Sequence, residues 1–198
     1  MAAKKEDISI YLSQAQNNVA FTGFMTAVVV FFNGLLLTNF ESYDAAIKIP
    51  IAFLIISTFG FLYSTLIFSN ATGEILTNNI KKFKKHEDIG NILSEYFGVY
   101  LLIFSIPLIV NMVTSDLFLQ IVTATSTFAG LLIYQFSHFS IMERHFGKSH
   151  NIISFVIIAL GVGLVITQIY QFYFTQLAAV FILFMIAMTY KAVRETKF

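Results

Sequence analysis

Six long apolar stretches, separated by short polar segments, dominate this chain of 198 residues. A helix needs about 20 mostly apolar residues to cross the hydrocarbon core of a bilayer, and each stretch approaches or reaches that length. Because backbone groups inside hydrocarbon must satisfy their own hydrogen bonds, the stretches are predicted to be transmembrane helices. The predicted spans cover residues 19–40, 49–69, 96–113, 117–139, 152–172 and 176–190. The predicted fold class is therefore all-α: a polytopic integral membrane protein with a single transmembrane domain over residues 1–198.

The composition excludes an ordinary soluble domain. Hydrophobic residues make up 57% of the chain and charged residues 12%, whereas soluble domains carry about 25% charged residues. A chain this small also lacks the polar residues to cover a water-exposed surface. The net charge is only +1 and the basic residues lie between the apolar stretches. This pattern predicts membrane lipids as surroundings and argues against nucleic acid as a partner.

The basic residues predict how the chain is threaded through the membrane. Lys81, Lys82, Lys84 and Lys85 occupy a polar segment, residues 70–94, which we predict to be a cytoplasmic loop. With the six predicted spans, eleven of the twelve Lys and Arg residues then fall on that side, and Lys48 falls on the other. This asymmetry predicts three outward-facing hairpins with both termini in the cytoplasm. Richness in Lys, Ile, Asn and Phe is typical of an AT-rich microbial genome and favours a prokaryotic plasma membrane.

Several kinds of chemistry lack the residues that they need. The chain has no cysteine, which excludes disulfides, thiolate-bound metals and thiol catalysis. No Asp, Glu, Lys or Arg falls inside the six predicted spans, and proton pumps and ion-coupled transporters usually need such a charge. An aspartate pair or an activated serine for intramembrane proteolysis is not visible. We therefore expect a non-enzymatic protein without a cofactor.

The fourth predicted span carries a continuous polar face. Its members recur every three or four residues, which places them on one side of a helix: Gln120, Thr123, Thr127, Gly130, Tyr134 and His138. One interpretation is that this face lines a pore or polar cavity. The other is close helix packing, because small and hydroxylated residues let helices approach and hydrogen-bond. Ser57, Gly60 and Ser64 repeat the pattern on the second span.

Three amide side chains lie in the outer halves of odd-numbered spans: Asn33, Asn111 and Gln168. One interpretation is that they converge on a shared outer cavity. The other is that each one pairs with a neighbouring group, because a buried amide without a hydrogen bond is costly.

A metal site is not expected. The candidate ligands are His138, Glu143, His145 and His150, and imidazole with carboxylate suits zinc or copper. Their spacing matches no compact metal site, and histidines at a membrane interface commonly meet water and headgroups instead.

Two functions from different classes fit these observations. The first is a channel or pore-like protein, homo-oligomeric, with the polar face of the fourth span near the permeation path. The second is an accessory, scaffold or sensory subunit that packs against other membrane subunits. Topology does not decide between them, because the same arrangement of spans serves many functions.

Overall fold

Helices form almost all of the computed structural model, which describes residues 2–136 and 145–196. Seven α-helices occur in this part of the chain: α1 (Ala2–Thr38), α2 (Lys48–Leu76), α3 (Ile80–Leu93), α4 (Tyr100–Val113), α5 (Leu117–Phe136), α7 (His150–Ile169) and α8 (Phe174–Glu195). Short 3₁₀ turns follow α1 and precede α7: η1 (Phe40–Ser42), η2 (Ala45–Ile47) and η4 (Gly147–Ser149). The described residues contain no strand, so the all-α prediction is confirmed.

Six helical segments of the described chain are long and apolar enough to cross a bilayer: Ile8–Thr38, Ala45–Leu76, Ile80–Val113, Leu117–Gln135, His150–Ile169 and Phe174–Glu195. The third of these joins α3 to α4 through a π-helical segment, η3 (Ser94–Val99). The prediction of a multi-pass membrane protein is confirmed at this level.

The segment 70–94, predicted to be a loop, is helical over most of its length. α2 continues to Leu76 and α3 begins at Ile80. Between them Asn78 adopts a left-handed backbone conformation, and the Asn79 side chain accepts a hydrogen bond from the Lys82 backbone N–H. Asn tolerates that conformation and is a preferred N-cap. Two helices therefore meet in a tight turn where hydropathy indicates only a polar segment.

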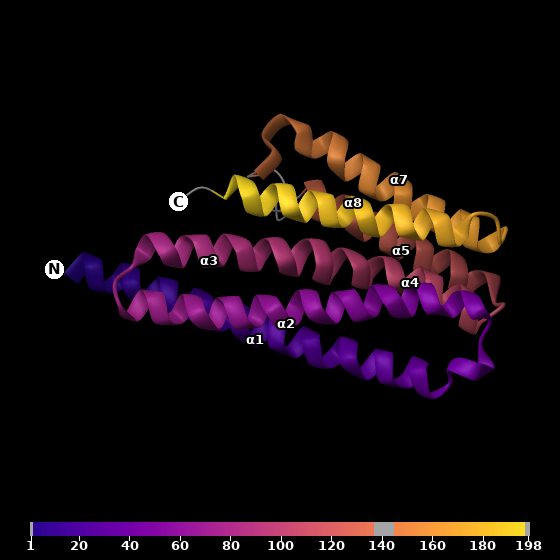
Figure 1. The fold of residues 1–198 in the computed structure, drawn as a ribbon, viewed down its shortest axis with the longest axis horizontal. Helices are drawn as coiled ribbons and strands as arrows, with labels where there is room; N and C mark the ends of the chain where they lie inside the picture. Colours follow the sequence, from indigo (N-terminus) through magenta and orange to yellow (C-terminus); the bar gives the residue numbers. More distant parts are fainter. Residues whose placement is uncertain (1, 137–144, 197–198) are drawn as a thin grey trace.

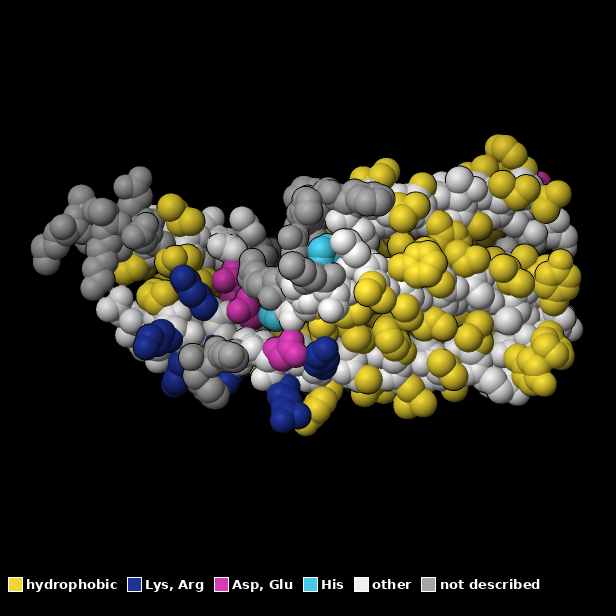
Figure 2. Space-filling view, turned by 90° about the horizontal axis from the view of Figure 1, so that it is seen from above, with side chains coloured by type: hydrophobic (Ala, Val, Ile, Leu, Met, Phe, Trp, Pro, Cys, Tyr) yellow, Lys and Arg dark blue, Asp and Glu magenta, His cyan; other side chains and the backbone are white. Residues whose placement is uncertain are grey.

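The helices run roughly along one axis (Figure 1). The beginning of α1, the α2–α3 turn and the end of α8 lie toward one end, and the α7–α8 turn lies toward the other. We call these the basic end, after Lys81–Lys85, and the far end. Figure 2 shows most visible charged side chains gathered at the basic end, with hydrophobic and uncharged groups over the rest of that face.

The main core joins α2, α4, α7 and α8. Phe53, Phe104 and Phe181 are fully buried, and the Phe104 and Phe181 rings meet edge to face with centroids 5.2 Å apart. Gly161 brings α7 against this cluster, because a Cβ at that position would lie 2.0 Å from the Phe104 ring. Aromatic pairs in this geometry stabilise a core beyond their buried area.

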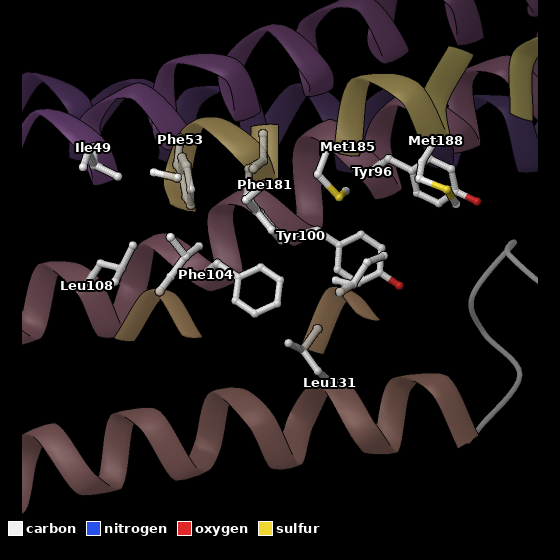
Figure 3. Packing of buried hydrophobic residues seen from close by; sticks show 14 of the residues in the cluster. Ile49, Phe53, Tyr96, Tyr100, Phe104, Leu108, Leu131, Phe181, Met185 and Met188 are labelled. Carbon is white, nitrogen blue, oxygen red and sulfur yellow. The ribbon is translucent and has the colours of Figure 1, made fainter. Parts of the chain in front are cut away.

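Helix α5 lies at the edge of this core. Only 6% of its most apolar stretch is buried, against 44% for the stretch that contains α2. Leu131 is its buried contribution to the main cluster, with Phe128 packed against it. Figure 3 shows α5 beside the core, with Leu131 directed toward it. Most of the α5 surface is therefore left uncovered by the described chain.

Candidate functional site along helix α5

The predicted polar face of α5 passes three different environments. Gln120 lines a pocket at the far end. Thr123, Thr127 and Gly130 line a groove beside α4. Tyr134 hydrogen-bonds a buried carboxylate toward the basic end. His138, the sixth predicted member, lies outside the described residues. The face thus carries a polar site toward each end and borders the groove between them.

The far-end pocket has a volume of about 620 Å³ and collects side chains from five parts of the chain. Asn111 at the end of α4 and Gln168 at the end of α7 meet there, with the Asn111 Nδ2 donating to Gln168 Oε1 at 3.1 Å. Gln168 Nε2 in turn donates to the Leu108 carbonyl at 2.8 Å. Gln120 Nε2 donates to the Thr114 carbonyl at 2.8 Å. Each of these three amides is therefore fixed by a hydrogen bond to a neighbouring group.

The α7–α8 turn supplies another wall of this pocket in an unusual backbone conformation. Gln171 and Tyr173 both have φ of 53°, and both line the pocket. Non-glycine residues rarely adopt positive φ, and such strained positions concentrate at functional sites. The Gln171 backbone N–H donates to the Gln168 carbonyl at 3.2 Å, which closes the turn at the end of α7.

The groove runs between α4 and α5 and has a volume of about 400 Å³. Its α4 wall contains Ile103 and Ile106, and its α5 wall contains Val122, Thr123, Ser126, Thr127, Gly130 and Leu131, so apolar surface predominates in the lining. Thr127 is buried, whereas Gly130 is exposed and a Cβ added there would meet no atom within 4 Å. At Gly130, therefore, no described residue packs closely against α5.

The third environment contains Glu95, which lies in the π-helical segment η3 and is only 4% exposed. The Tyr134 hydroxyl donates to Glu95 Oε2 at 3.0 Å. One residue further along α5, the Gln135 Nε2 donates to the Tyr100 hydroxyl. The Gln135 Oε1 accepts a hydrogen bond from Ser154 Oγ at 2.9 Å. These bonds join η3, α4, α5 and α7 through polar groups.

Sequence reasoning missed Glu95. It lies one residue before the third predicted span, residues 96–113, and so does not count among the residues of that span. The structure carries the helix without interruption from Ile80 to Val113 and buries this carboxylate. A buried acid at the edge of a transmembrane helix is a default functional candidate, and π-helical turns are frequent at functional sites. In the sequence, the position of Glu95 directly before the apolar run that begins at Tyr96 was the signal that this acid could be buried.

The third predicted amide has different surroundings. Asn33 is buried on α1, and its Nδ2 donates to the Thr58 hydroxyl of α2 at 3.3 Å. Its Oδ1 finds no hydrogen-bond partner among the described residues. Of the three amides, only Asn111 and Gln168 are brought together.

The small residues of the second span pack tightly. Ser57 Oγ donates to the Gly98 carbonyl at 2.8 Å, and Ser64 Oγ donates to the Gly90 carbonyl at 2.9 Å. A Cβ on Gly60 would lie 2.7 Å from the backbone nitrogen of Gly98. On α2 the small-residue pattern therefore serves helix packing.

The possible metal ligands are only partly described. His138 and Glu143 lie outside the described residues. Within residues 2–136 and 145–196, no group of three or more His, Cys, Asp or Glu is placed to hold a metal ion.

Comparison of the chain with protein-family models, with curated proteins and with solved structures found no match. The interpretation of the site therefore depends on its residues and geometry.

Proposed function

We propose that the protein is a homo-oligomeric membrane channel or pore-like protein whose permeation path follows the polar face of α5. The observation that supports this proposal is the continuity of that face. It begins at the far-end pocket with Gln120, passes the open groove at Gly130 and reaches the Glu95 network with Tyr134.

The need for a second copy follows from the openness of the groove. Gly130 and Ser126 are exposed on α5, and described residues leave space above Gly130. Polar groups facing hydrocarbon without partners are unfavourable. If α5 faces of neighbouring copies meet, the groove becomes enclosed and its hydroxyls face water or one another. Closed symmetric assemblies are the usual result when identical surfaces meet.

We place the protein in the plasma membrane with both termini in the cytoplasm, on the basis of the lysine asymmetry. In that orientation Glu95 lies toward the cytoplasmic end of the path and the far-end pocket opens outward. The carboxylate gives the path an acidic group at its inner end, which favours cations over anions.

The uncovered face of α5 also supports the second candidate, an accessory or scaffold subunit of a larger membrane complex. In that case a different protein covers the groove. The mass of the gently extracted native complex separates the two candidates. A symmetric homo-oligomer supports the channel, and stoichiometric foreign subunits support the accessory role.

Substitution at Gly130 tests the channel directly. Gly130→Leu adds a large apolar side chain at the groove, and its Cβ meets no atom within 4 Å. Raising a permeation barrier by about 1.4 kcal/mol slows flux about tenfold, so we expect at least that loss. The measurement is the release of K⁺ and of glycerol from proteoliposomes that contain purified protein.

Ala129→Leu is the matched control, since Ala129 is exposed on the same helix but lies away from the polar face. We expect its flux to equal that of the unmodified protein. Equal flux through both well-folded variants, or no flux through the unmodified protein, would contradict the channel proposal.

A further inference from the structure

We infer that the far-end pocket binds a small organic cation that carries an ammonium group. The inference deepens the proposed function, on which it rests for its role, because this pocket is the outer mouth of the proposed path. Binding itself is a property of the pocket and is measured without transport.

The first argument is the orientation of the paired amides. The Leu108 backbone carbonyl accepts a hydrogen bond and cannot donate one, so Gln168 must turn its Nε2 toward it. Gln168 Oε1 then faces Asn111, which must donate through Nδ2. The Asn111 Oδ1 consequently has no hydrogen bond among the described residues and is left as an acceptor in the pocket lining.

Gln120 of α5 repeats this arrangement. Its Nε2 donates to the Thr114 backbone carbonyl, which fixes the amide by the same reasoning. Its Oε1 makes no hydrogen bond among the described residues. Asn111 and Gln120 thus each donate through an N–H group and leave a side-chain carbonyl oxygen without a hydrogen bond. These free carbonyl oxygens can accept hydrogen bonds from the N–H groups of a ligand.

The charge of the lining points the same way. Among the described residues that line the pocket, Asp44 is the only charged one. Its Oδ1 accepts from the Ala46 backbone N–H at 2.8 Å, so its Oδ2 is available to a ligand. A carboxylate together with amide oxygens attracts an ammonium group through charge-assisted hydrogen bonds.

The size of the pocket favours an organic ligand over a bare ion. Its volume of about 620 Å³ lies within the range of pockets that hold small molecules. Ile169, Met112 and Phe174 supply apolar surface, and Tyr173 adds an aromatic ring. Aromatic rings tolerate and attract organic cations.

The experiment compares three molecules of similar size and different charge. The probes are 4-aminobutan-1-ol, which is a cation at pH 7, butane-1,4-diol, which is neutral, and 4-hydroxybutyrate, which is an anion. Binding to the full chain in nanodiscs of zwitterionic lipid is measured by ligand-observed NMR, with empty nanodiscs as the blank. We expect the cation to bind at least about tenfold more tightly than the diol, and the anion to bind least. Equal binding of cation and diol would overturn the inference.

Two capping aspartates provide a matched pair of variants. Asp44→Asn removes the pocket charge, while its amide oxygen still accepts from Ala46. Asp116→Asn changes a similar cap, in which Oδ1 accepts from the Leu119 N–H at 3.0 Å, outside the pocket. We expect cation binding to fall about tenfold in Asp44→Asn and to stay unchanged in Asp116→Asn. Equal losses in both, or no loss in either, would overturn the inference.

Gln120→Leu is an independent variant that removes one acceptor and leaves Asp44 intact. We expect several-fold weaker cation binding, and unchanged binding would count against the site. Flux without selective cation binding would overturn this inference alone. Cation binding without flux would overturn the proposed function alone.

Discussion

Two helices carry nearly the same pattern of small and hydroxylated residues, and the structure uses them differently. On α2, Ser57, Gly60 and Ser64 face the backbone of α3 and η3. The Ser57 hydroxyl donates to a carbonyl of η3, and the Ser64 hydroxyl donates to a carbonyl of α3. On α5, Gly130 faces open space. A small-residue pattern therefore indicates where a neighbour can approach closely, but it does not show that the same chain supplies that neighbour.

The largest expected difference between the two patterns concerns their glycines. Gly60→Ala places a Cβ 2.7 Å from the Gly98 nitrogen and 2.8 Å from the Phe97 carbonyl carbon, and backbone atoms cannot move aside cheaply. We expect the free energy of unfolding to fall by about 2–3 kcal/mol. Gly130→Ala meets no atom and gains helix propensity, so we expect a change between zero and an increase of about 1 kcal/mol.

Titration with SDS in mixed micelles measures both unfolding free energies. Gly73→Ala is the control on α2 itself, since a Cβ there also meets nothing within 4 Å, and it should behave like Gly130→Ala. Similar losses at Gly60 and Gly130 would remove the distinction between the packed face and the open face.

A smaller difference is expected between two serines. Ser57 is fully buried, and its hydroxyl bonds to the Gly98 carbonyl, whereas Ser126 is exposed in the groove lining. Ser57→Ala should lower the unfolding free energy by about 1 kcal/mol. Ser126→Ala should change it by about zero, and a loss at Ser126 as large as at Ser57 would show that α5 packs through this face.

Hydropathy was enough to predict the six helical spans, because it depends only on the order of residues along one helix. It was not enough for the groupings between helices. The Asn111–Gln168 bond joins residues 57 positions apart, and Asn33 bonds to α2 instead. Glu95 was missed because its burial depends on α3 continuing into η3 and on Tyr134 of another helix.

The same limit explains the segment 70–94. Its lysines predict contact with water, which both a loop and an exposed helix provide. The helical turn at Asn78 and Asn79 depends on backbone conformation and capping, and neither changes hydropathy.

The most direct test of the central claim is the water accessibility of the α5 polar face in the native membrane. The chain contains no cysteine, so single cysteines can be introduced without removing others. We would measure labelling of Thr123→Cys and Gly130→Cys by a membrane-impermeant thiol reagent, with Thr125→Cys and Ala129→Cys as controls on the opposite face of α5. The reacting species is the thiolate, which forms in water and not in hydrocarbon.

The account predicts that cysteines at 123 and 130 are labelled, and that those at 125 and 129 react at least about tenfold more slowly. Reagent that reaches neither face in the assembled native protein would show that the polar face of α5 borders no water, and would contradict the proposed path.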